Sequence, residues 1–278
     1  MLRIPDSVVQ FIKSALEEDI GNKDVTSELL IPKGLKSKAI YLAKEDFILA
    51  GIPFAELVFK LLDPSINFKS YFKEGSSIKK GYTIAKIKGN AYSILAGERL
   101  SLNILQRLSG IATLTNKYIE KIKGTKARIL DTRKTTPCMR YMEKYAVRIG
   151  GGNNHRFGLF DGILIKDNHI ALIGNMKDSI KRAKTAHHLL KIEVEVKNLR
   201  EFKIALESGA DIIMLDNMSI DEIKEAVKIN RKRAILEASG GITIENIREV
   251  AKTGVDYISI GAITHSAKAV DISLEIIK

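Results

Sequence analysis

Residues 192–239 read IEVEVKNLREFKIALESGADIIMLDNMSIDEIKEAVKINRKRAILEAS, and this stretch decides the fold class. Three short apolar runs, at 192–196, 211–216 and 234–239, are separated by segments that place apolar residues at helical spacing. One of these segments begins after Ser219, a residue type that commonly caps helices. Strands that alternate with helices indicate βαβ units and a parallel sheet. The stretch therefore predicts an α/β fold.

The same rhythm extends in both directions from this stretch. Further strands are predicted at 127–131, 162–166 and 257–261, with helices over 176–190 and 243–252. Each strand ends in a charged or small polar residue, and these residues are Asp131, Lys166, Glu195, Asp216, Ser239 and Gly261. In a β/α-barrel all carboxyl ends of the strands meet at one mouth. Because this region is shorter than the ~250 residues of an eight-unit barrel, we expect an incomplete six- or seven-stranded β/α-barrel.

The first hundred residues have a different pattern. Short strands with glycine turns are predicted between residues 37 and 92, flanked by helices over 7–18 and 55–62. A long helical stretch begins at about residue 98 and runs to about residue 123. We therefore expect an N-terminal α+β sandwich domain over 1–107 and a catalytic barrel over 108–267. The tail at 268–278 could pack back on the N-terminal domain.

The composition limits the classes of protein that remain. A single cysteine among 278 residues excludes an intrachain disulfide and favours a cytoplasmic location. The first twenty residues predict an amphipathic helix rather than a signal peptide, and no apolar run is long enough to span a membrane. The net charge of +12 favours anionic partners. The lysines are spread along the chain and no RNA-binding motif is present, so no nucleic-acid partner is expected.

Charged side chains gather at the predicted barrel mouth. Cations lie directly after the first predicted strand, before the second predicted strand and at the end of the second. Two acids end the next two predicted strands. These residues are Arg133, Lys134, His155, Arg156, Lys166, Glu195 and Asp216. A wall of cations with a pair of carboxylates suits a polyanionic substrate that carries Mg²⁺, since magnesium takes one or two carboxylates together with substrate phosphates.

Less specific interpretations of these residues remain open. Glu193 lies on the same inward face as Glu195, where a role in packing or in supporting a neighbouring site residue is expected. Lys166 could be a surface lysine, or the Schiff-base lysine of a barrel lyase.

Two glycine-containing segments predict a phosphate site. SGGIT (239–243) precedes the helix predicted from residue 243, and GAITHSA (261–267) precedes a short final helix. Small residues let main-chain N–H groups approach an oxyanion, and barrels commonly bind phosphate after their last strands. Ser239, Gly241, Gly261 and His265 are the candidates in these segments.

Long segments of the chain resemble the quinolinate phosphoribosyltransferase family. The resemblance is carried by EDIGNKDVTS (18–27), AGERLSLNILQRLSGIAT (96–113), DTRKTTP (131–137), YAVRIGGGNNHRFGLFDGILIKDNH (145–169), EVEV (193–196), IMLDN (213–217), LEASGGIT (236–243) and ISIGAITHSA (258–267). It implies transfer of phosphoribose from 5-phosphoribosyl-1-pyrophosphate to quinolinate, with Mg²⁺, giving nicotinate mononucleotide, pyrophosphate and CO₂ in de novo NAD synthesis.

The resemblance also implies a role for each matching residue. Arg133, His155, Arg156 and Lys166 would line the quinolinate pocket, with Lys134 near the reacting centre. Arg99 would reach in from the other subunit of a homodimer that shares its active sites and could associate further. Glu195 and Asp216 would serve the metal and the ribose hydroxyls, and Ser239, Gly241, Gly261 and His265 would hold phosphate.

Two departures from the family pattern and one alternative accompany this resemblance. Cys138 stands where the family usually has glycine, and Ile149 replaces a frequent cysteine. A related group with the same fold could instead act on another aromatic acid.

Overall fold

The computed structural model describes residues 3–277, which form two compact units. The first unit comprises the residues up to Asn116, Thr135–Gly151 and the residues from Thr264 onward. The second comprises Lys117–Lys134 and Gly152–Ile263. The domain boundary at residues 107 and 108 stays a prediction, since the chain passes between the two units several times.

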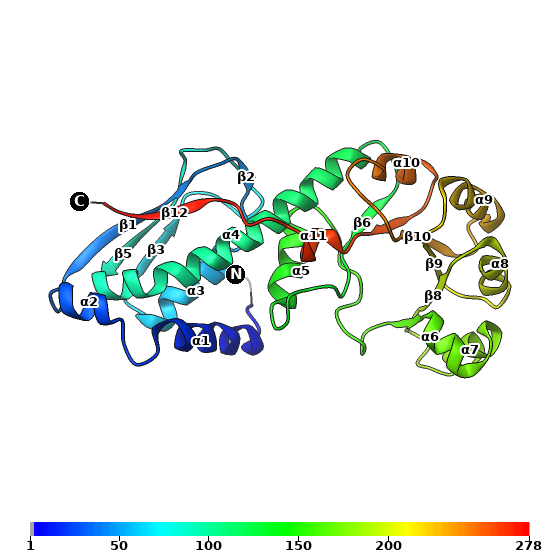
Figure 1. Ribbon diagram of the computed structural model, residues 1–278, viewed down its shortest axis with the longest axis horizontal. Helices are drawn as coiled ribbons and strands as arrows, with labels where there is room; N and C mark the ends of the chain where they lie inside the picture. The colour runs from blue at the N-terminus through cyan, green and yellow to red at the C-terminus, as the bar shows by residue number, and fades with distance from the viewer. Residues whose placement is uncertain (1–2, 278) are drawn as a thin grey trace. The chain divides into compact units, whose positions relative to one another are not determined.

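The second unit is built on a six-stranded parallel sheet (Figure 1). Its strands are β6 (Arg128–Leu130), β7 (Ile163–Ile165), β8 (Ile192–Val196), β9 (Ile212–Asp216), β10 (Ile235–Ser239) and β11 (Tyr257–Ser259). Their order is β6-β11-β10-β9-β8-β7, so β6 and β7 form the two edges and the barrel is open between them. This confirms the predicted incomplete β/α-barrel, with six strands.

Helices follow the strands, and local side-chain hydrogen bonds influence where these helices begin and end. They are α6 (Asp167–Ile173), α7 (Met176–Ala183), α8 (Leu199–Glu207), α9 (Ile220–Asn230) and α10 (Ile247–Lys252). Ser219 forms a capping box with Glu222 at the start of α9, as its residue type predicts. The helix predicted over 176–190 is wrong beyond Ala183, because the Thr185 hydroxyl donates to the Arg182 carbonyl and turns replace the helix.

The first unit is the expected α+β domain. Its antiparallel sheet has the order β12-β1-β5-β3, and a separate two-stranded ladder joins β2 and β4. The strands are β1 (Lys36–Ala43), β2 (Phe47–Ile48), β3 (Asn67–Ser70), β4 (Ser77–Ile78), β5 (Thr83–Asn90) and β12 (Ile272–Ile277). The helices are α1 (Asp6–Ile20), α2 (Val25–Leu30), α3 (Ile52–Leu62), α4 (Ala91–Ile122, counted here up to Asn116), α5 (Arg140–Ile149) and the end of α11 (Ala262–His265).

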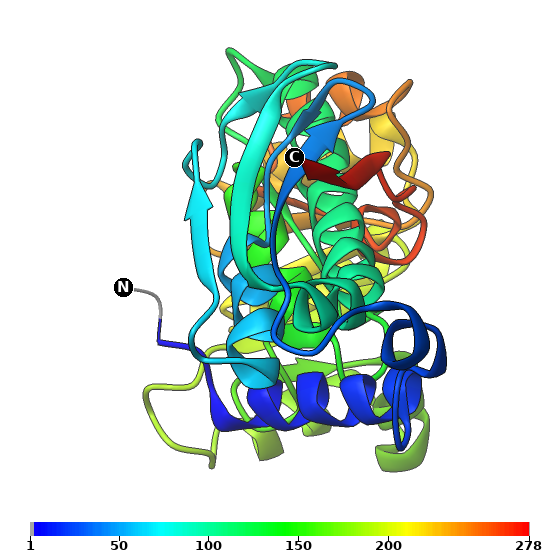
Figure 2. The ribbon, with the colours of Figure 1, turned by 90° about the vertical axis from the view of Figure 1, so that its left-hand side faces the viewer.

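Helix α4 lies along the antiparallel sheet (Figure 2). Ile94 and Leu105 of this helix join one buried cluster with Tyr41 and Ile87 of the sheet. The Tyr41 hydroxyl donates to the Ser101 hydroxyl at 2.6 Å, so the one polar atom of that buried ring has a partner. Among the described residues, no helix is both long enough and apolar enough to cross a membrane.

A buried ion pair ties α4 to α5 within the first unit. Arg107 lies 2.9 Å from Glu143, whose side chain is completely buried. The Arg107 guanidinium also donates to the main-chain carbonyls of Thr264 and Ala267. The second oxygen of Glu143 accepts the Thr136 main-chain N–H. One carboxylate therefore anchors the segment that follows DTRK, the start of α5 and the C-terminal arm.

We expect Arg107→Met to destabilise the protein by about 3 kcal/mol, because it leaves the Glu143 carboxylate buried without its cation. Denaturant unfolding would measure the change. The double variant Arg107→Met/Glu143→Gln should recover part of the loss, since the amide carries no charge. Equal destabilisation in the single and double variants would show that the ion pair is not the source.

Candidate active site

Four of the predicted site residues lie at the carboxyl ends of neighbouring strands. Lys166 directly follows β7, and its Nζ lies 2.8 Å from an oxygen of Glu195 near the end of β8. Asp216 ends β9, where it pairs in register with Ser239 at the end of β10. The structure therefore brings these predicted residues to one end of the sheet, where β/α-barrels have their active sites.

The segment that carries His155 is held against the edge strand β6 by a buried carboxylate. Asp131, directly after β6, is fully buried. One of its oxygens accepts the Asn154 side-chain amide at 2.6 Å, and the other accepts the His155 main-chain N–H at 2.8 Å. Asn153 adds a parallel bridge to Leu130. These bonds place residues 153–155 in the gap between β6 and β7.

Two guanidinium groups lie close enough to oppose each other electrostatically. Partial burial lowers the pKa of Arg156, and the nearby charge of Arg133 lowers it further. The Arg156 guanidinium nevertheless stays protonated, because arginine does not lose its charge in proteins. Like charges held together favour an anion that would bind between them. The exposed Lys134 follows Arg133 in the same loop.

The glycine segment after β10 forms a tight turn. Gly240 has φ 85°, and a Cβ there would lie 2.3 Å from the Asn217 side chain, so only glycine fits. Gly241 follows with φ 60°. The helix predicted from residue 243 begins only at Ile247, because Asn246 uses its side chain to bind the main chain of Thr243 and Gly241. The helix N-terminus expected at residue 243 is therefore displaced to Asn246 and Ile247.

Two predicted residues belong to the first unit. Arg99 is an exposed residue of α4. His265 is the last residue of α11 rather than a residue before that helix, and its Nδ1 lies 2.6 Å from the Ser266 hydroxyl. Gly261 belongs to the second unit, between β11 and α11.

A buried layer of ionisable groups lies one step further inside the barrel. The His155 Nε2 atom is 3.0 Å from Glu193 of β8 and 3.8 Å from Glu237 of β10. Glu193 and Glu237 are 5% and 2% exposed, and each has one carboxylate oxygen without a hydrogen-bond partner in the described structure. A cavity of about 540 Å³ beside them opens toward the strand starts at Lys191, Ile212 and Ile235.

Glu237 is a residue that the sequence reasoning missed. Side chains alternate between the two faces of the strand over 235–239, so Glu237 lies on the same face as Ser239. This alternation was the signal in the sequence that could have identified Glu237. Glu193 was expected to pack or to support a neighbouring site residue, and the structure shows it paired with the candidate residue His155.

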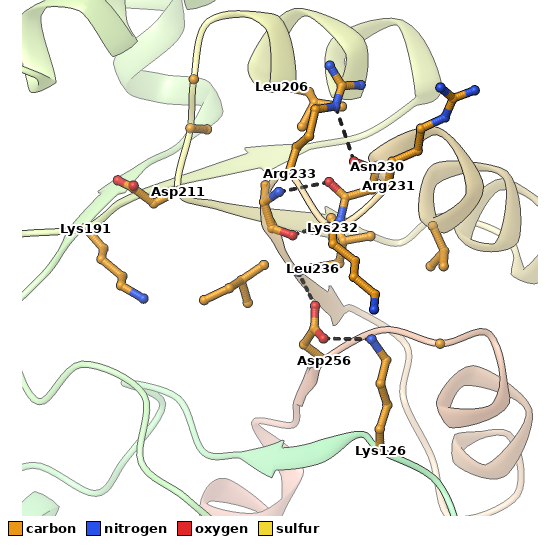
Figure 3. A pocket seen from close by; sticks show the side chains of 16 residues that line it. Lys126, Lys191, Leu206, Asp211, Asn230, Arg231, Lys232, Arg233, Leu236 and Asp256 are labelled. Carbon is orange, nitrogen blue, oxygen red and sulfur yellow. Dashed lines mark hydrogen bonds and ion pairs between the residues drawn. The ribbon is translucent and has the colours of Figure 1, made fainter.

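A second cavity borders the amino-terminal ends of the strands (Figure 3). It has a volume of about 840 Å³ and is bordered by Lys126, Lys191, Lys232 and Asp256. Lys126 is already paired with Asp256 at 2.8 Å, and in the picture the side chains of Arg231 and Arg233 point away from Asp256. This cavity shares none of the predicted site residues.

Two family models match almost the whole chain. The N-terminal domain of quinolinate phosphoribosyl transferase matches residues 24–109, and its C-terminal domain matches residues 111–275. The chain belongs to this family.

Individual members of the family are similar over their full length. A probable carboxylating nicotinate-nucleotide pyrophosphorylase of Methanocaldococcus jannaschii is 46% identical, with 99% of each chain covered. The Bacillus subtilis protein of the same name is 44% identical over 93% of this chain and 90% of its own. The solved nicotinate-nucleotide pyrophosphorylase of Francisella tularensis has a TM-score of 0.93 at 43% identity, covering 99% of this chain and 98% of that one.

The departure from the quinolinate phosphoribosyltransferase pattern at Cys138 now has a physical meaning. Its φ is 64°, in the left-handed region where a side chain is strained. The glycine that is usual in the family adopts this conformation without strain. Cys138 is exposed, so the substitution affects the backbone and not the core.

The buried Glu237 predicts a pH-dependent stability. Burial raises the pKa of Glu237 to about 7, and the neighbouring Glu193 carboxylate acts in the same direction. The folded state therefore holds this proton more tightly than the unfolded state, and the stability falls as the pH rises from about 4.5 to about 7.

We expect Glu237→Gln to raise the melting temperature at pH 8 by about 2–4 °C, with a smaller gain at pH 5, because glutamine avoids the buried charge. Thermal unfolding at both pH values would measure this. Glu207→Gln, at an exposed position of α8, should show no such difference. A gain that is equal at both pH values would contradict the ionisation of Glu237.

Proposed function

We propose that this protein transfers the phosphoribosyl group of 5-phosphoribosyl-1-pyrophosphate to the nitrogen of quinolinate, releasing pyrophosphate and CO₂ and forming nicotinate mononucleotide. This reaction is a step of de novo NAD synthesis. The observation that carries it is the match of both family domains across the chain, together with cations and carboxylates at the carboxyl ends of the strands.

The arginine pair supports quinolinate as the acceptor. Quinolinate carries two carboxylates, and guanidinium groups bind carboxylates through paired hydrogen bonds. Arg133 and Arg156 repel each other in the free protein. A bound dianion would relieve this repulsion, so binding energy is available at the place where the acceptor ring must be oriented. Lys166 and Lys134 add positive charge around the same loops.

The pair Glu195 and Asp216 fits a magnesium ion. Their carboxylates come from adjacent strands at the same end of the sheet, and a Mg²⁺ site usually needs only one or two protein carboxylates beside substrate phosphates. Magnesium would neutralise charge that develops on the leaving pyrophosphate. The chain itself contributes the Lys166 contact, which holds Glu195 in place at 2.8 Å.

The tight turn at Gly240 and Gly241 supports phosphate binding. Two consecutive glycines with left-handed φ follow Ser239, and turns of this kind present main-chain N–H groups to anions. Gly261 and His265 complete the proposed set. A homodimer whose active sites receive Arg99 from the neighbouring subunit, and a cytoplasmic location, are further parts of this proposal.

The direct test is product formation from quinolinate, 5-phosphoribosyl-1-pyrophosphate and Mg²⁺, with nicotinate and other aromatic acids as parallel acceptors. We expect nicotinate mononucleotide and CO₂ from quinolinate alone. No product from quinolinate, but a phosphoribosylated product from another acid, would reassign the acceptor while leaving the family unchanged.

The carboxylate pair predicts the magnesium dependence. Asp216→Asn should raise the Mg²⁺ concentration for half-maximal rate by about tenfold, the effect of losing roughly 1.4 kcal/mol of metal binding. Combining it with Glu195→Gln should raise the requirement further. Rates across a magnesium titration at fixed donor concentration would measure both variants, with Glu207→Gln as a control. An unchanged dependence in the double variant would exclude these residues as metal ligands.

A further inference from the structure

The buried group of His155, Glu193 and Glu237 has the spacing of a metal site. One donor atom from each residue lies within 4.8 Å of the others, and two carboxylate oxygens there have no hydrogen-bond partner in the described structure. The hydrogen bonds of the His155 ring decide between a metal site and another role.

The two ring nitrogens of His155 have different hydrogen-bond partners, one a donor and the other an acceptor. Its Nδ1 accepts the main-chain N–H of Arg156 at 2.8 Å, so Nδ1 carries a lone pair and no proton. A neutral imidazole must then carry its proton on Nε2, which points to Glu193 at 3.0 Å. A protonated Nε2 has no lone pair for a metal ion. A doubly protonated ring would have to give up this bond to Nδ1.

We propose that Glu193 is a positioning residue that acts on Arg156 through His155. The Glu193 carboxylate accepts the Nε2–H of His155 and thereby keeps Nδ1 as the acceptor for the Arg156 main chain. The role assigned to Glu193 depends on the proposed function, in which Arg156 binds the carboxylates of quinolinate.

The surroundings of Arg156 make this support necessary. Its Nη1 donates to the Gly162 carbonyl at 2.8 Å, whereas its buried Nε has no partner in the described structure. Arg133 repels it. The bond to Gly162 holds the guanidinium only while the main chain of Arg156 stays in place, and the bond to His155 fixes the nitrogen of the same residue. Asp131 fixes the preceding nitrogen, that of His155.

The position of Glu193 in the sheet suits a rigid support. It lies on β8, a strand that pairs with both β7 and β9, and its side chain is 7% exposed. Its carboxylate cannot follow the movements of the loop, so the direction of the His155 ring is set by the strand. Groups supported in this way hold a substrate more accurately than groups on a free loop.

Two substitutions at residue 193 separate the hydrogen bond from packing. Glu193→Gln keeps an oxygen that can accept from Nε2–H, whereas Glu193→Leu has a similar volume and no acceptor. We expect the leucine variant to raise the KM for quinolinate about tenfold, the effect of losing one hydrogen bond near a charged group. Its KM for 5-phosphoribosyl-1-pyrophosphate should change less than twofold, and the glutamine variant should stay within about threefold of wild type in both.

The tautomer of His155 gives a readout that does not depend on activity. Nitrogen NMR of the five histidines, with His155 assigned by substitution, should show a protonated Nε2 and an unprotonated Nδ1 in the wild type and in Glu193→Gln. The leucine variant should lose this preference. Ser259→Ala is a matched control, since Ser259 is buried in the same layer, beside Glu237. It should change neither the tautomer nor either KM.

Each outcome decides the question. Three results would each overturn the role of Glu193. The first is a wild-type His155 ring protonated on Nδ1, and the second is a stoichiometric metal ion that binds at this cluster and is lost in Glu193→Gln. The third is an equal change of both KM values in the leucine variant. If wild-type protein forms no product from quinolinate, the proposed function fails, and the NMR result still tests the Glu193–His155 bond. If the leucine variant does not fold, the wild-type tautomer and the glutamine variant decide.

Discussion

The carboxylate of Asp131 is the interaction on which the barrel unit depends. The sheet does not close, so β6 and β7 leave a gap that a regular strand would otherwise fill. Asp131 is fully buried and uses both oxygens to hold residues 154 and 155 in that gap. A buried carboxylate that accepts several hydrogen bonds is stable, and one without them is not. The loop that carries His155 and Arg156 is therefore as well defined as a strand.

The ionisable groups inside the barrel form two layers with different chemistry. At the carboxyl ends of the strands, Lys166 pairs with Glu195, and Asp216 lies on the next strand. One step deeper, Glu193 and Glu237 are almost free of solvent contact. In the outer layer, charge is available to ligands. In the inner layer, charge is expensive, and the His155 Nε2 atom lies 3.0 Å from Glu193 and 3.8 Å from Glu237.

Much of the fold was predictable because strand and helix periodicities are local. The apolar runs ending at Glu195, Asp216 and Ser239 correspond to β8, β9 and β10 within two residues. Local side-chain bonds defeated the prediction at two places. Thr185 ends α7 early, and Asn246 delays α10. Both residue types form hydrogen bonds to the main chain that compete with helical ones, and a periodicity pattern does not record this competition.

The sequence by itself determined the fold class, the family and the positions at strand ends where charge gathers. These properties follow from the order of residues along the chain, because every parallel strand delivers its last residues to the same end of the sheet. Only the tertiary structure decided which charges meet. Glu237 and His155 are 82 residues apart in the numbering, and their meeting depends on how strands β8 and β10 lie around the loop held by Asp131. The burial that raises the pKa of Glu237 is a property of that packing, and so is the hydrogen bonding that fixes the ring of His155. Neither is encoded at either position alone.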